Sequence, residues 1–116
     1  MSEPRKAPGA MRLPDVEADI HFLGTSEGGR SSRAISGYRP GHAVREDYIA
    51  TGVHDYLDVA EAIPGETTRA TITFMTPEAY PGTFWVGKVV PVQEGSHVVG
   101  YATITKIFND ILGTAG

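Results

Sequence analysis

The sequence contains no cysteine, and this absence excludes several kinds of site at once. A disulfide framework, a thiolate zinc site, an iron–sulfur cluster and a cysteine nucleophile all need a cysteine sulfur. Long apolar runs are also lacking, since no segment approaches the roughly 18 consecutive apolar residues of a membrane-spanning helix. The first residues carry no apolar stretch of the signal-peptide kind. We therefore expect a cytoplasmic protein that does not engage a membrane.

Positive charge is scarce as well. The chain has 10 Lys and Arg residues against 14 Asp and Glu residues, which gives a net charge of −4. A protein that coats nucleic acid carries a surplus of positive charge, so any contact with nucleic acid must be local here. Hydrophobic residues make up 41% and charged residues 21% of the 116 residues, as in ordinary globular domains. This composition predicts one folded domain.

The chain divides into three parts by composition. Residues 1–14 are polar and proline-rich and carry the basic residues Arg5, Lys6 and Arg12, which predicts a flexible, mildly basic tail. At Asp15 the pattern changes abruptly to alternation of apolar and polar residues. The expected domain covers residues 15–108, and residues 109–116 are expected to form a C-terminal tail.

Alternation with a period of two predicts an all-β domain, because successive strand side chains point to opposite faces. Turns are expected at Pro64-Gly65 and Glu94-Gly95, and a break between two adjoining strands at Thr51-Gly52. No helical periodicity extends over ten residues. Six short strands of this kind are typical of a small barrel or sandwich. The expected strands are residues 16–22, 42–52, 53–59, 66–75, 84–90 and 96–108.

The motifs of several enzyme classes are missing. The phosphate-binding pattern G-x-x-x-x-G-K-[ST], the dinucleotide pattern G-x-G-x-x-G and the nucleophile-elbow pattern G-x-S-x-G do not occur. Each of these patterns supplies backbone amides or a nucleophile that the corresponding chemistry requires. We therefore expect a protein that is not an enzyme, with no catalytic residue and no cofactor.

The histidines and the acidic pairs are interpreted as ordinary surface groups. No two histidines have the spacing that places both rings on one face of a strand or helix, so no metal site is expected. The alternative is a composite site formed by His42, His54 and Asp55. The histidines are His21, His42, His54 and His97, and the acidic pairs, expected to be solvated, are Glu46-Asp47 and Asp55/Asp58.

Arginines and aromatic residues gather in and after a glycine-rich stretch at residues 24–41. Arg30, Tyr38, Arg39 and Arg45 could hold a phosphate backbone or stack a base. The same arginines could instead pair with nearby carboxylates and brace the loop. Trp85 is expected to face the side opposite to its neighbour Phe84, where it could anchor a partner protein or pack on a loop.

Several short motifs occur in a fixed order along residues 15–107. They are Glu27-Gly28-Gly29-Arg30, Gly37-Tyr38-Arg39-Pro40, Thr51-Gly52, Pro64-Gly65, Thr76-Pro77, and Glu94-Gly95 with Val99-Gly100. In their order and spacing these motifs resemble the C-terminal third domain of translation elongation factor Tu. The resemblance implies a single six-stranded antiparallel β-barrel, without the GTPase domain and the second barrel of that factor.

The resemblance also implies partners. In that family the third domain contacts aminoacyl-tRNA, packs on the GTPase domain and helps to bind the exchange factor. Glu94 and Gly95 match the family's Glu-Gly pair beside the tRNA backbone. Thr76, Gln93 and His97, however, stand where the family carries basic residues. Loss of phosphate-binding cations lowers affinity for RNA, which favours a protein partner.

Two hypotheses for function follow. The first is a non-catalytic binding module that docks on a protein, either a translation component or a GTPase domain in trans. The second is a protein that binds tRNA or another structured RNA through a local arginine and aromatic surface. The residues expected at either interface are Arg30, Tyr38, Arg39, Arg45, Trp85, Lys88, Glu94 and Gly95. Self-association through Trp85 or through the apolar segment 107–112 is left open.

Overall fold

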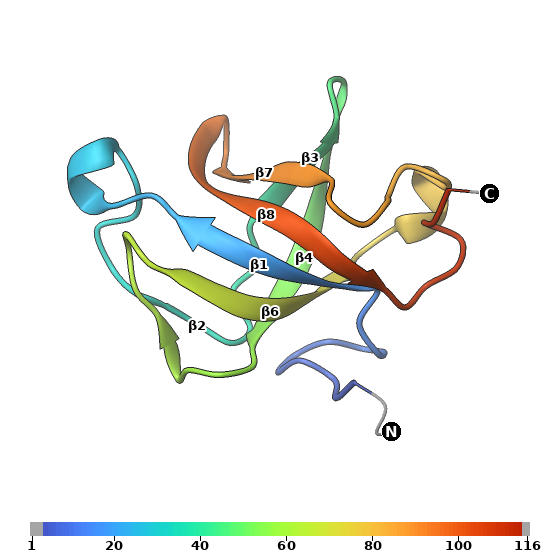
Figure 1. Cartoon of the computed structure of the whole chain (residues 1–116), viewed down its shortest axis with the longest axis horizontal. Helices are drawn as coiled ribbons and strands as arrows, with labels where there is room; N and C mark the ends of the chain where they lie inside the picture. Colours follow the sequence, from blue (N-terminus) through green and yellow to red (C-terminus); the bar gives the residue numbers. More distant parts are fainter. Residues whose placement is uncertain (1–3, 115–116) are drawn as a thin grey trace.

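The computed structural model describes residues 4–114 and is all-β. Six strands close into an antiparallel barrel in the order β1-β6-β4-β3-β7-β8, with β8 paired to β1 (Figure 1). The predicted all-β, six-stranded antiparallel barrel is therefore confirmed. The barrel strands are β1 (Val16–Phe22), β3 (Gly41–Arg45), β4 (Tyr48–Tyr56), β6 (Thr67–Phe74), β7 (Val89–Glu94) and β8 (His97–Ile107). The remaining elements are the paired strands β2 (Ala34–Ile35) and β5 (Glu61–Ala62) and the 3-10 turns η1 (Thr25–Glu27) and η2 (Pro77–Ala79).

The barrel interior is filled by alternate residues of each strand. In β1, Ala18 and Ile20 are buried while the intervening Asp19 is exposed, as the alternation of the sequence predicts. Ile72 of β6 lies next to Val16 in the strand register and shares its face. The small apolar core that results occupies the inside of a closed sheet with no free barrel edge.

The predicted break at Thr51-Gly52 is wrong. β3 ends at Arg45, the hairpin turns at Glu46 and Asp47, and β4 runs through Gly52 without interruption. A side chain at Gly52 would bring its Cβ within 2.7 Å of the Cγ2 atom of Ile72. Glycine is therefore required there by close packing inside the strand rather than by a change of direction.

The predicted strand at residues 84–90 is displaced in the structure. Phe84 pairs with Gly113, and β7 starts only at Val89. Between them the amide of Lys88 donates to the carbonyl of Trp85 at 3.1 Å, and Gly87 has a φ of +97°, which ends the extended run. The predicted orientations are correct, because Phe84 is buried and Trp85 is half-exposed. The turns predicted at residues 64–65 and 94–95 are present.

Both chain ends lie against the barrel within the described residues. We call residues 4–14 the N-terminal strap, and Figure 1 shows it folded back beside the barrel. Ala7 of the strap is buried, and Arg5 forms an ion pair with Asp55 of β4. Near the other end, Leu112 is buried and its amide donates to the carbonyl of Asn109. Residues 1–3 and 115–116 of the expected tails lie outside the described residues.

Candidate functional site

The eight predicted interface residues fall into two groups at opposite ends of β7 and one separate position. Arg39 stands apart and donates to the carbonyl of Gly9 in the strap at 2.9 Å. The two groups lie about 17 Å apart, the length of a six-residue strand. Arg45, Trp85 and Lys88 lie near the start of β7, and Arg30, Tyr38, Glu94 and Gly95 lie near its end.

The group at the end of β7 is centred on the Glu94 carboxylate. Arg30 and the Tyr38 hydroxyl both donate to its Oε2 atom, and the Arg30 guanidinium lies 4.5 Å from the centre of the Tyr38 ring. The hydrogen bond from Tyr38, together with Arg30, lowers the pKa of Glu94. Burial and the bond to Glu94 raise the pKa of Tyr38. The group therefore holds a neutral tyrosine and one matched pair of opposite charges.

This pairing decides what the group can bind. The positive charge of Arg30 faces Glu94, so a phosphate at Arg30 would have to compete with that carboxylate. His97 adds a further link, because its Nε2 atom donates to the carbonyl of Gly28 in the glycine-rich stretch. These contacts fasten the glycine-rich stretch to the hairpin between β7 and β8. They correspond to the bracing role that the sequence left open for these arginines.

The group at the start of β7 presents an indole to solvent. Trp85 is 50% exposed, and the Lys88 ammonium lies 4.8 Å from the centre of its ring. Lys88 also donates to the carbonyls of Val44 at 2.7 Å and of Thr83. Burial and the nearby Arg45 lower the pKa of Lys88. Lys88 thus fastens the loop that contains Trp85 to strand β3.

Exposed aliphatic side chains surround this indole. Val86 follows Trp85, and Val89 begins β7; each exposes more than half of its side chain. Ile49 of β4 is similarly exposed, but its Cγ2 atom lies over Gly41, which pairs with Gln93 near the other end of β7. Isolated apolar side chains are common on protein surfaces, but a contiguous group marks a contact site. We define the tryptophan face as Arg45, Tyr48, Trp85, Val86, Lys88 and Val89.

Two of the four histidines are not surface residues, so the prediction for them is wrong. His42 and His54 are fully buried, with their Nε2 atoms 2.8 Å apart. His42 Nδ1 lies 3.0 Å from the carbonyl oxygen of Ala50, and His54 Nδ1 lies 3.0 Å from the Tyr56 hydroxyl. Both rings occupy inward positions of β3 and β4. The alternation of neighbouring apolar residues could have indicated that these two histidines are buried.

The hydrogen bonds fix where the protons of this pair lie. The carbonyl of Ala50 only accepts, so His42 donates from Nδ1 and accepts at Nε2. His54 then donates from Nε2 and accepts the Tyr56 proton at Nδ1. Burial lowers the pKa of His42 to about 4 and that of His54 well below its usual value. The rings are therefore neutral and completely hydrogen-bonded.

The proposed composite site of His42, His54 and Asp55 does not assemble. Asp55 follows His54 in β4, so the two side chains point to opposite faces of the sheet. The prediction that Asp55 is solvated is also wrong, because Arg5 covers it with two hydrogen bonds, of 2.7 and 3.1 Å. Asp58, by contrast, is exposed and pairs with Arg69 at 2.9 Å.

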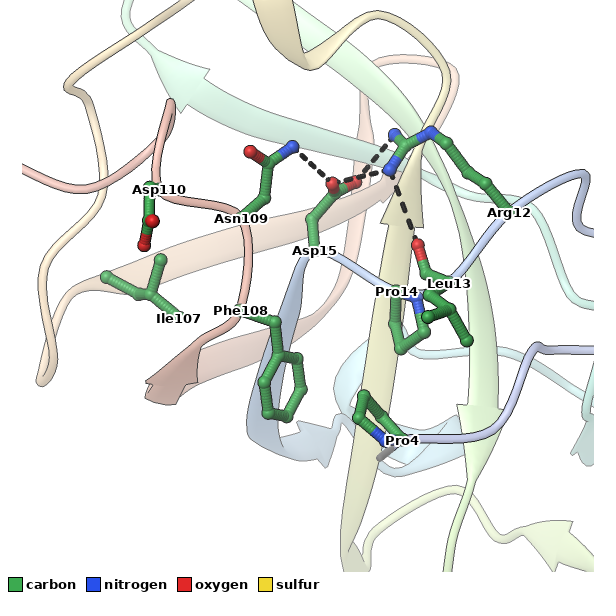
Figure 2. A pocket seen from close by; sticks show the side chains of 9 residues that line it. All are labelled: Pro4, Arg12, Leu13, Pro14, Asp15, Ile107, Phe108, Asn109 and Asp110. Carbon is green, nitrogen blue, oxygen red and sulfur yellow. Dashed lines mark hydrogen bonds and ion pairs between the residues drawn. The ribbon is translucent and has the colours of Figure 1, made fainter. Parts of the chain in front are cut away.

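Sequence reasoning missed a buried acid at the entrance to β1. Asp15 accepts two hydrogen bonds from Arg12, at 2.7 and 2.9 Å, and one from Asn109 at 2.8 Å. The amide of Phe74 donates to it at 2.7 Å. Figure 2 shows Asp15 between Arg12 and Asn109, among the residues that line a groove between the strap and the chain after β8. Asp15 thus joins the strap, the end of β6 and the segment after β8.

Three further findings concern the sequence and the described residues. No protein-family model matches the sequence. Within residues 4–114, no cluster of three or more histidine, aspartate or glutamate side chains has the arrangement of a metal site. The described part also contains no helix that is long and apolar enough to cross a membrane.

Proposed function

We propose that this chain is a non-catalytic binding module that docks on a partner protein through the tryptophan face. The observation that carries the proposal is the half-exposed Trp85, held in place by Lys88 and bordered by exposed Val86 and Val89. Tryptophan is enriched among the residues that contribute most to protein–protein binding, because its large ring loses much apolar surface on contact. A pre-ordered loop also lowers the entropy cost of docking.

The charges of the tryptophan face indicate the kind of partner. Arg45 and Lys88 border the apolar side chains; Arg45 pairs with Asp47 at 3.6 Å, whereas no carboxylate of the described residues lies within 4 Å of the Lys88 ammonium. A partner surface with an apolar hollow and acidic residues at its rim complements this arrangement. The resemblance to the third domain of elongation factor Tu supports a translation component, or a GTPase domain in trans, as that partner.

The alternative proposal is binding of tRNA or another structured RNA at the same face. It is favoured by the position of Arg45, 5.9 Å from the centre of the Tyr48 ring, close to a second cation and an exposed indole. Aromatic rings can stack unpaired bases while cations contact phosphates. The net charge of −4 and the pairing of Arg30 with Glu94 weigh against it.

The two proposals are separated by capture from native cytosol with the tagged full chain, with and without ribonuclease. Trp85→Ala removes the central ring of the tryptophan face. Ile35→Ala is the control, because Ile35 is also an exposed apolar residue but lies on β2. We expect the wild-type chain and the control to retain one ribonuclease-resistant protein, and the Trp85 variant to lose it.

Three results would contradict docking of a protein at this face. The first is equal recovery by the Trp85→Ala and wild-type chains, and the second is failure to recover any protein. The third is recovery of tRNA with loss of the accompanying protein after ribonuclease treatment, which would support the alternative. In that case binding should weaken steeply as salt concentration rises.

A further inference from the structure

The strap covers an outward face of the barrel that is unusually polar for a buried surface. Asp55 lies opposite Thr71 in the pairing of β4 and β6, and Val53 lies opposite Thr73. All four side chains point away from the barrel core, yet each is less than 5% exposed. We call these four residues the covered face. Outward strand residues are buried only where another segment lies on them, and here the strap does so.

The polar groups of the covered face are incompletely satisfied. The hydroxyls of Thr71 and Thr73 are buried and have no hydrogen-bond partner among the described residues. Buried polar groups in folded proteins are almost always paired, so two orphaned hydroxyls side by side call for an explanation. A segment able to donate or accept hydrogen bonds at these positions would fit the covered face better than the strap does.

The strap also packs loosely. A cavity of about 370 Å³ separates Gly9, Ala10 and Met11 of the strap from Val53 and Thr73 of the covered face. Among residues 4–114, no backbone–backbone hydrogen bond joins the strap to a barrel strand; the first such bond runs from the amide of Asp15, just after it. The strap is therefore held by side chains alone, which is characteristic of an occupant that can leave.

One of these side-chain contacts is an arginine on a recessed acid, in addition to the contact that Arg12 makes with Asp15. The Arg5 side chain is 61% exposed, whereas the Asp55 side chain that receives it is 2% exposed. Arg5 approaches through two nitrogen atoms and donates a third bond to the carbonyl of Tyr56 at 3.1 Å. This geometry recognises a guanidinium rather than a positive charge in general, because an ammonium lacks the planar fork.

We propose that the covered face is a binding site for an arginine-bearing extended segment of another protein, and that the strap occupies it in cis. The barrel supplies the acid, the Tyr56 carbonyl and the two free threonine hydroxyls, and among these groups the strap contacts the acid and the carbonyl through the Arg5 guanidinium. A partner segment with an arginine at the same place and polar groups over Thr71 and Thr73 would displace the strap. This site is separate from the tryptophan face.

The test uses a fluorescent synthetic peptide with the sequence of residues 4–12 and the full-length protein. Arg5→Ala frees Asp55 and weakens the hold of the strap on the covered face. A tethered strap competes at an effective concentration in the millimolar range, so its weakening should reveal the site. We expect the peptide to bind the Arg5→Ala protein at least tenfold more tightly than the wild type, as measured by fluorescence anisotropy.

Specificity is tested by removing either side of the arginine–carboxylate contact. We expect binding to be lost when Asp55→Asn is added to Arg5→Ala, or when the first arginine of the peptide is replaced by alanine. The peptide change leaves the protein untouched, so the result does not depend on the stability of the double variant. One control should match the wild type: Arg33→Ala, which removes another exposed arginine paired with a carboxylate.

The proposal is overturned by equal binding of the two peptides or by equal binding to the wild-type and Arg5→Ala proteins. Failure of the Arg5→Ala protein to bind the peptide at millimolar concentration would also overturn it, and would make the strap a permanent part of the fold. A wild-type dimer that Arg5→Ala abolishes in light scattering would assign the covered face to a second copy of the chain instead.

Discussion

At the scale of single residues, the buried histidine pair shows how hydrogen bonding selects a protonation state. At one end the carbonyl of Ala50 accepts a hydrogen bond from His42, and at the other end the Tyr56 hydroxyl donates one to His54. His42 and His54 therefore carry one ring proton each. A further proton on Nε2 of His42 would face the proton that His54 carries on its own Nε2 atom. The pair therefore stays neutral inside the barrel.

This arrangement predicts that acid destabilises the protein before its carboxylates titrate. The pKa of His42 falls from 6.5 to about 4 on folding, and that of His54 is also lowered, so the unfolded chain binds protons that the folded chain excludes. Between about pH 6.5 and about pH 5, the free energy of unfolding should decrease by up to about 1.4 kcal/mol per pH unit for each histidine. Urea unfolding at several pH values measures this slope.

His21 provides the matched control for this measurement. Its ring is exposed on β1, so His21→Gln should leave the slope unchanged. A free energy of unfolding that stays constant over this range would show that the buried pair accepts a proton as readily as the unfolded chain does.

Residue-level predictions from the sequence succeed where local alternation is sufficient and fail where distant strands meet. The outward position of Trp85 follows from its neighbour Phe84. The separation of Arg30 from Arg45 depends instead on the pairing of β3 with β7, which no local pattern encodes. The ion pair between Arg5 and Asp55 likewise joins a segment without periodicity to the middle of β4.

At the scale of elements, the Asp15 carboxylate joins three segments that are distant in sequence. It receives hydrogen bonds from Arg12 in the strap, from the backbone of Phe74 at the end of β6, and from Asn109 after β8. Segments near both chain ends are therefore attached to the barrel at Asp15. Strands β1, β6 and β8 were predicted within about one residue at each end because their alternation is long, whereas the contact that joins the strap, the end of β6 and the segment after β8 is a single side chain.

Removal of this carboxylate should loosen all three segments together. Asp15→Ala leaves the Phe74 amide and Arg12 without their acceptor in a buried position, and we expect a loss of about 3 kcal/mol or more in the free energy of unfolding. Asp19→Ala, on the exposed face of β1, is the control and should change it by less than about 0.5 kcal/mol. Chemical denaturation of both variants gives the comparison. Similar losses in the two variants would refute the joining role of Asp15.

At the scale of the whole molecule, closure of the barrel depends on contacts between the two ends of the chain. β1 pairs with β8 along its entire length, although most of the sequence lies between them. Such pairing cannot form until a long loop has closed, and the entropy cost of that closure slows folding. The order of the strands was not predicted, since strand alternation does not state which strands are neighbours.

Refolding should accordingly be slow for a domain of this size. We expect relaxation in the millisecond to second range. The far-ultraviolet circular dichroism signal of the β-strands should recover in the same phase as the hydrogen-exchange protection of β1 and β8. Stopped-flow dilution from denaturant measures the rate. Recovery of most of the signal in microseconds would contradict dependence on closure between β1 and β8.

The placement of the single tryptophan also makes the protein its own optical probe. Indole emission moves to shorter wavelength when water leaves the ring. Because the chain has one tryptophan, emission after selective excitation of tryptophan comes from Trp85 alone. Because that ring is half-exposed on the tryptophan face, its spectrum reports occupancy of that surface. Titrations of the tryptophan face can thus be followed without a label on the protein.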